Sequence, residues 1–175
     1  LPTGKWQWFD NNKQVQRTIR YKNGIKDGNF KIYTEGILSL SGTYYQDKRH
    51  NEWKWFRDQN DLDSLTSYSF GDLDGTYKAW HSNGELKVSG FFSNNKFDGE
   101  WRWFSEEGKI DSMKTMANGI PNGISKLYFK NGQLKEQAIY KKGKLDGEKS
   151  TYYISGQLRN KIEYRLNEKM GPFEL

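Results

Sequence analysis

A glycine recurs every 24 residues along this 175-residue chain, and the period constrains the fold more than any other feature. The recurring positions are Gly4, Gly28, Asn51, Gly75, Gly99, Gly123, Gly147 and Gly171; only Asn51 is not glycine, and it follows after 23 residues. A repeat of this length is one supersecondary unit that buries its apolar face against its neighbours. We therefore predict a single repeat array over residues 1–175. Its units start at 4, 28, 51, 75, 99, 123 and 147, with a partial unit from 171.

Aromatic residues recur in phase with the glycines. Counting each opening residue as the first, the third position holds Trp6, Phe30, Trp53, Tyr77 and Trp101, then Ser125 and Lys149. The sixth position holds Phe9, Tyr33, Phe56, Trp80, Phe104, Tyr128 and Tyr152. Only 34% of the residues are hydrophobic while 16% are aromatic, so we expect burial to depend on Trp, Tyr and Phe.

Turn residues divide each unit into two short runs with two-residue alternation. Asn83-Gly84 and Asn131-Gly132 predict a type I′ hairpin turn, and an aliphatic residue such as Leu86 or Leu134 follows. A second turn, complete in residues 23–28, leads to the next unit. The sequence predicts an all-β, elongated antiparallel β-meander of hairpin repeats of about 24 residues, in a single curved, twisted sheet.

Alternation assigns side chains to faces. Trp101 and Trp103 are expected to share a face with Ile110 and Met116, and Phe104 is expected on the other face. The sixth-position aromatics share that other face with cations at the fourth position: Lys31, Lys54, Lys78, Arg102 and Lys126. These two sets are the candidate binding surface, because interleaved rings and cations bind anionic partners. Alternatively, the lysine stems cover the rings while Glu52, Glu100 and Glu148 neutralise the charges.

The repeat resembles bacterial MORN-like proteins, in the variant that includes YwqK-type antitoxins. The resemblance is carried by the Gly-x-aromatic-x-x-aromatic openings, the x-Asn-Gly-x-Leu centres at 82–86 and 130–134, and the Asn-Gly-x-x-Asp-Gly return. It covers essentially the whole chain. It implies a β-hairpin array that serves as a scaffold, a membrane-associating module, a partner-binding surface or an antitoxin that neutralises a toxin.

No motif predicts catalysis. The chain has no cysteine, which excludes thiol chemistry and cysteine-based metal sites, and its histidines, His50 and His81, stand outside any catalytic motif. Recurring acids such as Asp98 and Asp146 occur where turns favour them. We expect no enzyme, no metal site and no cofactor. A singular site would have to lie between Arg57 and Leu65, where the turn and the spacing depart from the pattern.

The charge distribution and the repeat period indicate which classes of partner the chain binds. The net charge of +6 is scattered and forms no basic tail, which ranks nucleic acid low, and the period differs from that of aromatic cell-wall-binding repeats, which ranks carbohydrate low. We expect a protein partner, with an anionic membrane surface as the alternative. No apolar run is long enough to span a bilayer, so we expect a soluble chain. The start at Leu1 favours a processed or trimmed protein. The bacterial envelope and the cytoplasm both remain open.

Overall fold

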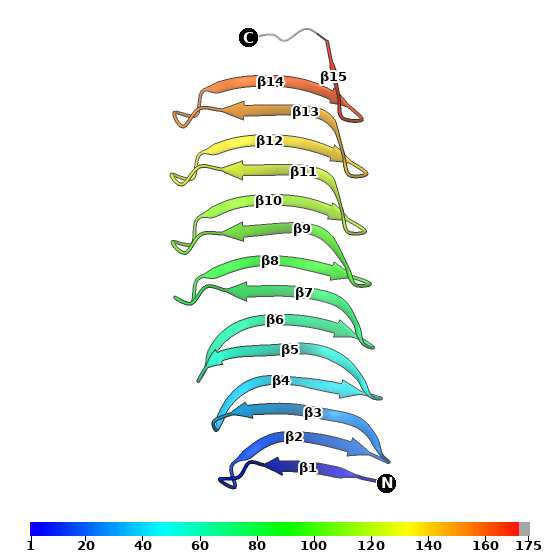
Figure 1. Ribbon diagram of the computed structural model, residues 1–175. Coiled ribbons are helices and arrows are strands. Elements are labelled where there is room, and N and C mark those ends of the chain that lie inside the picture. Colours follow the sequence, from blue (N-terminus) through cyan, green and yellow to red (C-terminus); the bar gives the residue numbers. More distant parts are fainter. Residues whose placement is uncertain (172–175) are drawn as a thin grey trace. The chain divides into compact units, whose positions relative to one another are not determined.

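The alternating runs of the sequence form β-strands in the computed structural model, which describes residues 1–171 (Figure 1). Residues 172–175 lie outside the described part, and with them most of the partial unit predicted from 171. The chain divides into two compact units, an N-terminal unit of residues 1–84 and a C-terminal unit of residues 85–175.

The N-terminal unit contains β1 (Gly4–Phe9), β2 (Val15–Lys22), β3 (Ile25–Thr34), β4 (Ile37–Tyr45), β5 (Lys48–Asp58), β6 (Asp61–Ser69) and β7 (Asp72–Trp80). The C-terminal unit contains β8 (Leu86–Ser93), β9 (Lys96–Phe104), β10 (Ile110–Ala117), β11 (Ile120–Tyr128), β12 (Leu134–Lys141), β13 (Lys144–Tyr152), β14 (Leu158–Arg165) and β15 (Glu168–Met170). Within each unit every strand pairs antiparallel with the next one in the chain. The predicted all-β class and antiparallel meander of hairpins are confirmed. No helix that could cross a bilayer occurs between residues 1 and 171.

The turn in the middle of most repeats has three residues. In the turn after β11, the amide of Gly132 donates to the carbonyl of Phe129 at 2.8 Å, and the amide of Phe129 donates to the carbonyl of Gln133 at 2.8 Å. Gly132 has φ 86°, whereas Asn131 is not among the residues with positive φ. This is a type I turn followed by a left-handed glycine, so the type I′ turn predicted at Asn131-Gly132 is wrong.

Two-residue turns of type I′ occur instead where one repeat returns to the next. Asn23 and Gly24 have φ 51° and 86°, and they connect β2 to β3. Asp27 and Gly28, which the sequence placed in the same turn, lie inside β3. Gly28 has φ 113° and sits at a register shift in the β2–β3 pairing, opposite the break between Ile19 and Tyr21. The repeat therefore opens at a β-bulge that requires a left-handed residue.

The same conformation explains the one opening position without glycine. Asn51 has φ 59°, and asparagine is one of the few other residues that adopt the left-handed region readily. The preceding spacing of 23 residues is explained by the turn after β3, where Glu35 and Gly36 form a two-residue turn with φ 51° and 80°. That turn is one residue shorter than its counterparts.

A second bulge corrects one face assignment. Ile110 pairs with Phe104 and Ser112 pairs with Trp103, so β10 contains one extra residue at this point. Directly opposed side chains lie on one face of a sheet, which places Ile110 with Phe104. The prediction that Ile110 shares the face of Trp101 and Trp103 is therefore wrong, because an extra residue reverses the alternation. The prediction for Met116 is confirmed, since Met116 pairs with Gly99 and Trp101 follows Gly99 by two residues.

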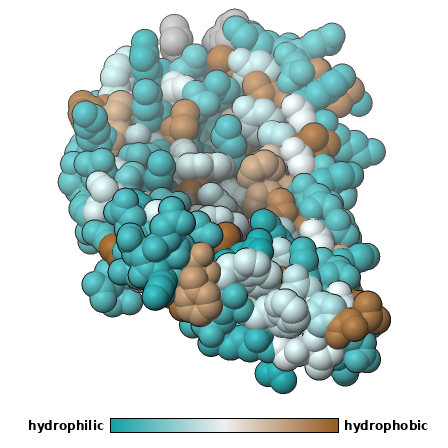
Figure 2. All heavy atoms as spheres, turned by 60° about the horizontal axis from the view of Figure 1, so that its bottom comes forward, coloured by the Kyte–Doolittle hydropathy of each residue, from teal (hydrophilic) through white to brown (hydrophobic). Residues whose placement is uncertain are grey.

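The third-position aromatics form the core. Trp53 is fully buried and Trp101 is 2% exposed, although each belongs to an antiparallel sheet whose strands simply follow one another. The Trp53 ring lies against Phe30, Tyr44 and Tyr68, with ring centroids 5.5, 5.1 and 6.2 Å away. Hydrophilic residues cover most of the surface visible in Figure 2, and hydrophobic residues appear there in small groups. The third-position rings are therefore buried by other side chains on the same face of their sheet.

Glycines in the neighbouring strands make room for both tryptophans. A Cβ at Gly42 would overlap the Trp53 ring, and a Cβ at Gly90 would overlap the Trp101 ring. Each indole nitrogen also donates to the backbone beside its glycine: Trp53 Nε1 to Thr43 O at 3.2 Å, and Trp101 Nε1 to Phe91 O at 3.1 Å. The second glycine of the repeat is thus a contact surface for the tryptophan of the following repeat.

Candidate functional site

The fourth-position and sixth-position residues are distributed over both units. Lys31, Lys54, Lys78, Phe9, Tyr33, Phe56 and Trp80 belong to the N-terminal unit, whereas Arg102, Lys126, Phe104, Tyr128 and Tyr152 belong to the C-terminal unit. Phe9 is 57% exposed, and the other sixth-position aromatics are half-buried. Five of the six half-buried rings lie opposite the aliphatic residue that follows the turn, as Tyr33 does opposite Leu38 and Tyr128 opposite Leu134. The rings are therefore partly covered by their own hairpins.

Two of the five cations are neutralised as the alternative interpretation expects. Lys54 Nζ lies 3.4 Å from Glu52 Oε2, and Arg102 Nη2 lies 2.5 Å from Glu100 Oε1. Glu148 binds a different cation: it accepts hydrogen bonds from Lys161 at 2.8 Å and from Ser150 at 2.6 Å. These bonds, that from Lys161 foremost, lower the pKa of the Glu148 carboxyl. Within residues 1–171, Lys31, Lys78 and Lys126 form no ion pair.

Lys31 lies in a hollow of the N-terminal unit with a volume of about 1000 Å³. Two of the predicted aromatics, Tyr33 and Phe56, line the same hollow. Val15 and Leu38 add apolar surface beside these rings, and side-chain amides come from Gln7, Gln14, Asn29, Gln59 and Asn60. The structure thus brings three of the twelve predicted surface residues to one open, mixed polar and apolar site.

Two cations of this hollow are not among the predicted residues. Lys5 of β1 and Arg20 of β2 line it together with Lys31, and Glu35 is the only carboxylate in the lining. Lys5 and Arg20 are directly opposed across the β1–β2 pair, an arrangement in which like charges repel. Neither forms an ion pair in the described part of the chain.

A signal for these cations exists in the repeat itself. Lys5 and Asn29 occupy the second position, which is glutamate in the units that start at 51, 99 and 147. Two of those glutamates neutralise the fourth-position cation of their own strand. The first two repeats lack this acid, so their cations are left uncompensated. The fourth-position cations alone do not reveal which repeats lack the neutralising glutamate.

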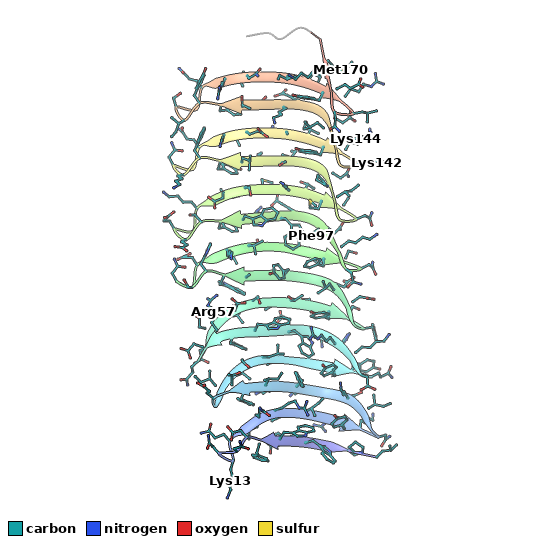
Figure 3. All side chains as sticks on the ribbon, in the orientation of Figure 1. Lys13, Arg57, Phe97, Lys142, Lys144 and Met170 are labelled. Carbon is teal, nitrogen blue, oxygen red and sulfur yellow. The ribbon has the colours of Figure 1, made fainter. Side chains whose placement is uncertain are left out.

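The irregular segment around Arg57 forms a structural clasp. Arg57 lies at the edge where β5 turns into β6 (Figure 3), and its guanidinium donates two hydrogen bonds to Asp61, at 2.8 and 2.9 Å, and one to Asp63 at 3.0 Å. It also donates to the carbonyls of Trp80 at 2.8 Å and His81 at 2.7 Å. The hydrogen bonds from Arg57 hold the pKa of the Asp61 carboxyl below its ordinary value. This segment connects the end of β7 to the β5–β6 turn.

The residue before several of the opening positions bonds to the next return turn. Asn122 Oδ1 accepts from the amide of Lys142 at 3.0 Å, Asp146 Oδ1 from Leu166 at 3.3 Å, and His50 Nδ1 from Phe70 at 3.5 Å. A backbone bond accompanies all three, from Gly143 to Pro121, from Asn167 to Leu145 and from Gly71 to Arg49, each at 2.8 Å. These polar residues therefore tie consecutive repeats together, and not their own turns as the sequence indicated. No group of three His, Asp or Glu that could hold a metal occurs among residues 1–171.

The comparison with family models identifies the repeat. The model described as MORN repeat variant matches residues 2–23, 73–94, 97–118 and 121–142, which together make up about half of the chain. The chain belongs to the MORN repeat variant family. A comparison with curated proteins gave no match.

The four MORN matches cover Lys5 and Arg20 but leave out residues 24–72. The unmatched stretch contains Lys31, Tyr33 and Phe56, as well as Arg57 and the shortened turn at Glu35-Gly36. The hollow therefore joins a MORN repeat that follows the family pattern to neighbours that depart from it. MORN repeats are in general binding modules, so the family match supports a binding function for this chain.

Proposed function

We propose that this MORN-repeat chain is a non-enzymatic protein-interaction scaffold, whose partner docks on the face that carries the fourth-position cations and sixth-position aromatics. The observation that carries the proposal is the hollow of the N-terminal unit, where unpaired Lys31 lies with Tyr33 and Phe56. Partly exposed rings beside cations are typical of residues that anchor protein interfaces. The non-enzymatic character is supported by the recurrence of the same residue types at equivalent positions, because a catalytic site is singular.

Site-specific crosslinking tests this proposal. A photoreactive phenylalanine analogue is placed at Tyr33 in one variant and at Tyr128 in a second, and each protein is irradiated in an extract of its source cell. We expect a discrete crosslinked protein from at least one of the two positions. The matched control carries the analogue at Phe70, which is 52% exposed at a return turn outside the proposed face. Crosslinks that are equally strong from Phe70, or none from either test position, would contradict the scaffold function.

An anionic membrane surface is the second candidate, favoured by the unpaired ammonium groups of Lys31, Lys78 and Lys126. Flotation with phosphatidylserine vesicles distinguishes it from protein binding. A membrane function predicts flotation that weakens with salt and is lost in a Lys78→Glu, Lys126→Glu variant. Flotation that ignores both changes would argue against it. The antitoxin role implied by the YwqK resemblance stays a prediction, to be tested by co-expression with a candidate toxin.

A further inference from the structure

The positive charge of the N-terminal hollow is not compensated within the sheet. Its lining holds Lys5, Arg20 and Lys31 against the single carboxylate of Glu35. The β1–β2 pairing places Lys5 opposite Arg20, and the β2–β3 pairing places Thr18 opposite Lys31. Three cations therefore face the same space across three adjacent strands. Like-charged pairs in direct opposition destabilise a sheet, so this cluster is costly to folding when nothing is bound.

The cations and most of the apolar side chains lie in different parts of the hollow. The cations come from β1, β2 and β3, whereas Leu38 and Phe56 come from β4 and β5. Val15 and Tyr33 stand at the strand ends beside the turns. A ligand that fits both parts carries negative charge at one end and an apolar group at the other.

The size of the hollow indicates an extended chain. Its lining reaches from β1 to β5, and four spacings of about 4.8 Å span about 19 Å. An extended peptide covers that length with about six residues at about 3.3 Å each. The amides of Gln7, Asn29 and Asn60 can bond the polar backbone of such a peptide. A bilayer surface is broad and cannot enter a recess of about 1000 Å³, whereas a single extended segment can.

We propose that this hollow binds an extended acidic peptide segment of the partner protein, with its carboxylates on Lys5, Arg20 and Lys31 and an apolar side chain against Tyr33 and Phe56. The proposal rests on the scaffold function and names the chemistry of its partner. Lys54 and Arg102 of the predicted set are not part of the site, and both are already paired with glutamates.

Fluorescence anisotropy with the full chain tests the proposal. The probes are labelled hexapeptides of three glutamates followed by Leu-Phe-Leu, and the reverse order, since the direction of binding is left to the experiment. We expect saturable binding of one probe, at least 10-fold weaker binding when glutamine replaces its glutamates, and weakening with added salt. Equal binding of the glutamine peptide would overturn the proposal, as would the absence of binding by both orders.

Two charge variants separate the hollow from the general charge of the protein. Lys5→Gln with Arg20→Gln is expected to weaken probe binding at least 10-fold. Lys142→Gln with Lys144→Gln, at a return turn of the C-terminal unit (Figure 3), makes the same change in net charge and is expected to alter binding less than 2-fold. Equal weakening by both variants would show a nonspecific charge effect and overturn the site.

The melting temperature of the first variant shows whether lost binding reflects lost folding. Removing opposed like charges is expected to leave it unchanged or to raise it. Weak binding by a variant that melts earlier than the wild-type chain would count against the site. Phosphatidylserine vesicles that bind through Lys5 and Arg20 while both peptides fail would assign the hollow to a membrane surface and overturn the peptide. If the peptides fail but Tyr128 still crosslinks a protein, the scaffold function stands and only this inference is lost.

Discussion

At the scale of single residues, the size of the third-position side chain is matched by the size of the residue that it faces on the neighbouring strand. Trp53 and Trp101 lie against Gly42 and Gly90, whereas Tyr77 is opposite Thr66 and Lys149 is opposite Ala138. Phe30, the smaller ring, is opposite Ile19. A large third-position residue is thus accommodated by a smaller residue in the preceding repeat. This pairing maintains dense packing within a single sheet.

We expect Gly42→Ala to destabilise the N-terminal unit by about 1–3 kcal/mol, because the added methyl group overlaps the Trp53 ring and overpacking costs about this much. Chemical denaturation of the full chain measures the change. Gly42→Thr combined with Trp53→Tyr copies the Thr66 and Tyr77 pair, and it should be less destabilised than Gly42→Thr alone. If the double variant is the less stable of the two, the size-matching explanation is wrong.

The interrepeat hydrogen bond of Asn122 makes a second residue-scale prediction. Asn122→Ala removes the acceptor for the amide of Lys142 and is expected to cost about 1 kcal/mol of unfolding free energy. Asn122→Asp is the matched control, since Asp146 performs the same function in the next repeat. Thermal melts of the two variants distinguish a lost acceptor from a change of surface residue. Equal destabilisation by both would refute the role of the acceptor oxygen.

At the scale of elements, Arg57 holds three strands together through side-chain and backbone acceptors. It bonds carboxylates at the start of β6 and carbonyls at the end of β7 while belonging to β5. A planar guanidinium can make these bonds simultaneously, which lysine cannot. The local departure from the repeat pattern is therefore explained by structure, at the position where a singular chemical site was considered.

We expect Arg57→Met to lower the melting temperature of the N-terminal unit by several degrees at neutral pH. The folded-state pKa of Asp61 is lowered by its hydrogen bonds from Arg57, so the contribution is present above the ordinary carboxyl value of 3.8 and is lost as the pH falls through the folded pKa. The difference from the wild-type chain should shrink toward about pH 2.5. Lys22→Met, an exposed change of equal charge, serves as the control. A difference in melting temperature that grows as the pH is lowered would contradict the stabilising role of the Arg57 hydrogen bonds.

At the scale of the whole molecule, pairing is local in both units. Within each unit, every strand pairs with the strands next to it in the chain, as expected for a MORN array whose repeats bury surface against neighbours. The free energy of unfolding is then a sum of contributions from the single repeats and from the interfaces between neighbouring repeats. A defect in one repeat should weaken its neighbours and fade with distance along the chain.

Hydrogen exchange by mass spectrometry tests this locality. In Gly42→Ala we expect faster amide exchange in β3, β4, β5 and β6, and unchanged exchange in β11, β12, β13 and β14. Gly90→Ala is the reciprocal variant, with faster exchange expected in β8, β9 and β10 and none in β1, β2 and β3. Uniform acceleration along the chain in either variant would indicate one cooperative structure in place of neighbour-limited stability.

The repeat period alone predicted much of the molecule. The recurring glycines, the in-phase rings of Phe30, Trp53 and Trp101, and the turn residues specify antiparallel hairpins with an aromatic core, because alternation and turn chemistry are local properties of a chain. The same counting located Lys31, Tyr33 and Phe56 on one surface. It could not include Lys5, which becomes notable only by comparison with the glutamates at the second position of other repeats, or Arg20, which becomes notable only through its pairing with Lys5.

The tertiary structure decided what depends on register and on contacts across strands. The bulge beside Phe104 adds one residue to β10 and reverses the alternation, so Ile110 lies on the face opposite to the one counting assigns, whereas the bulge at Gly28 adds two residues to β3 and preserves it. The type of each turn follows from backbone φ values that Asn-Gly alone leaves open. Ion pairing likewise depends on which acid is within reach. The chain by itself therefore determined the repeat and its core, and only the folded register determined which cations remain unpaired around the hollow.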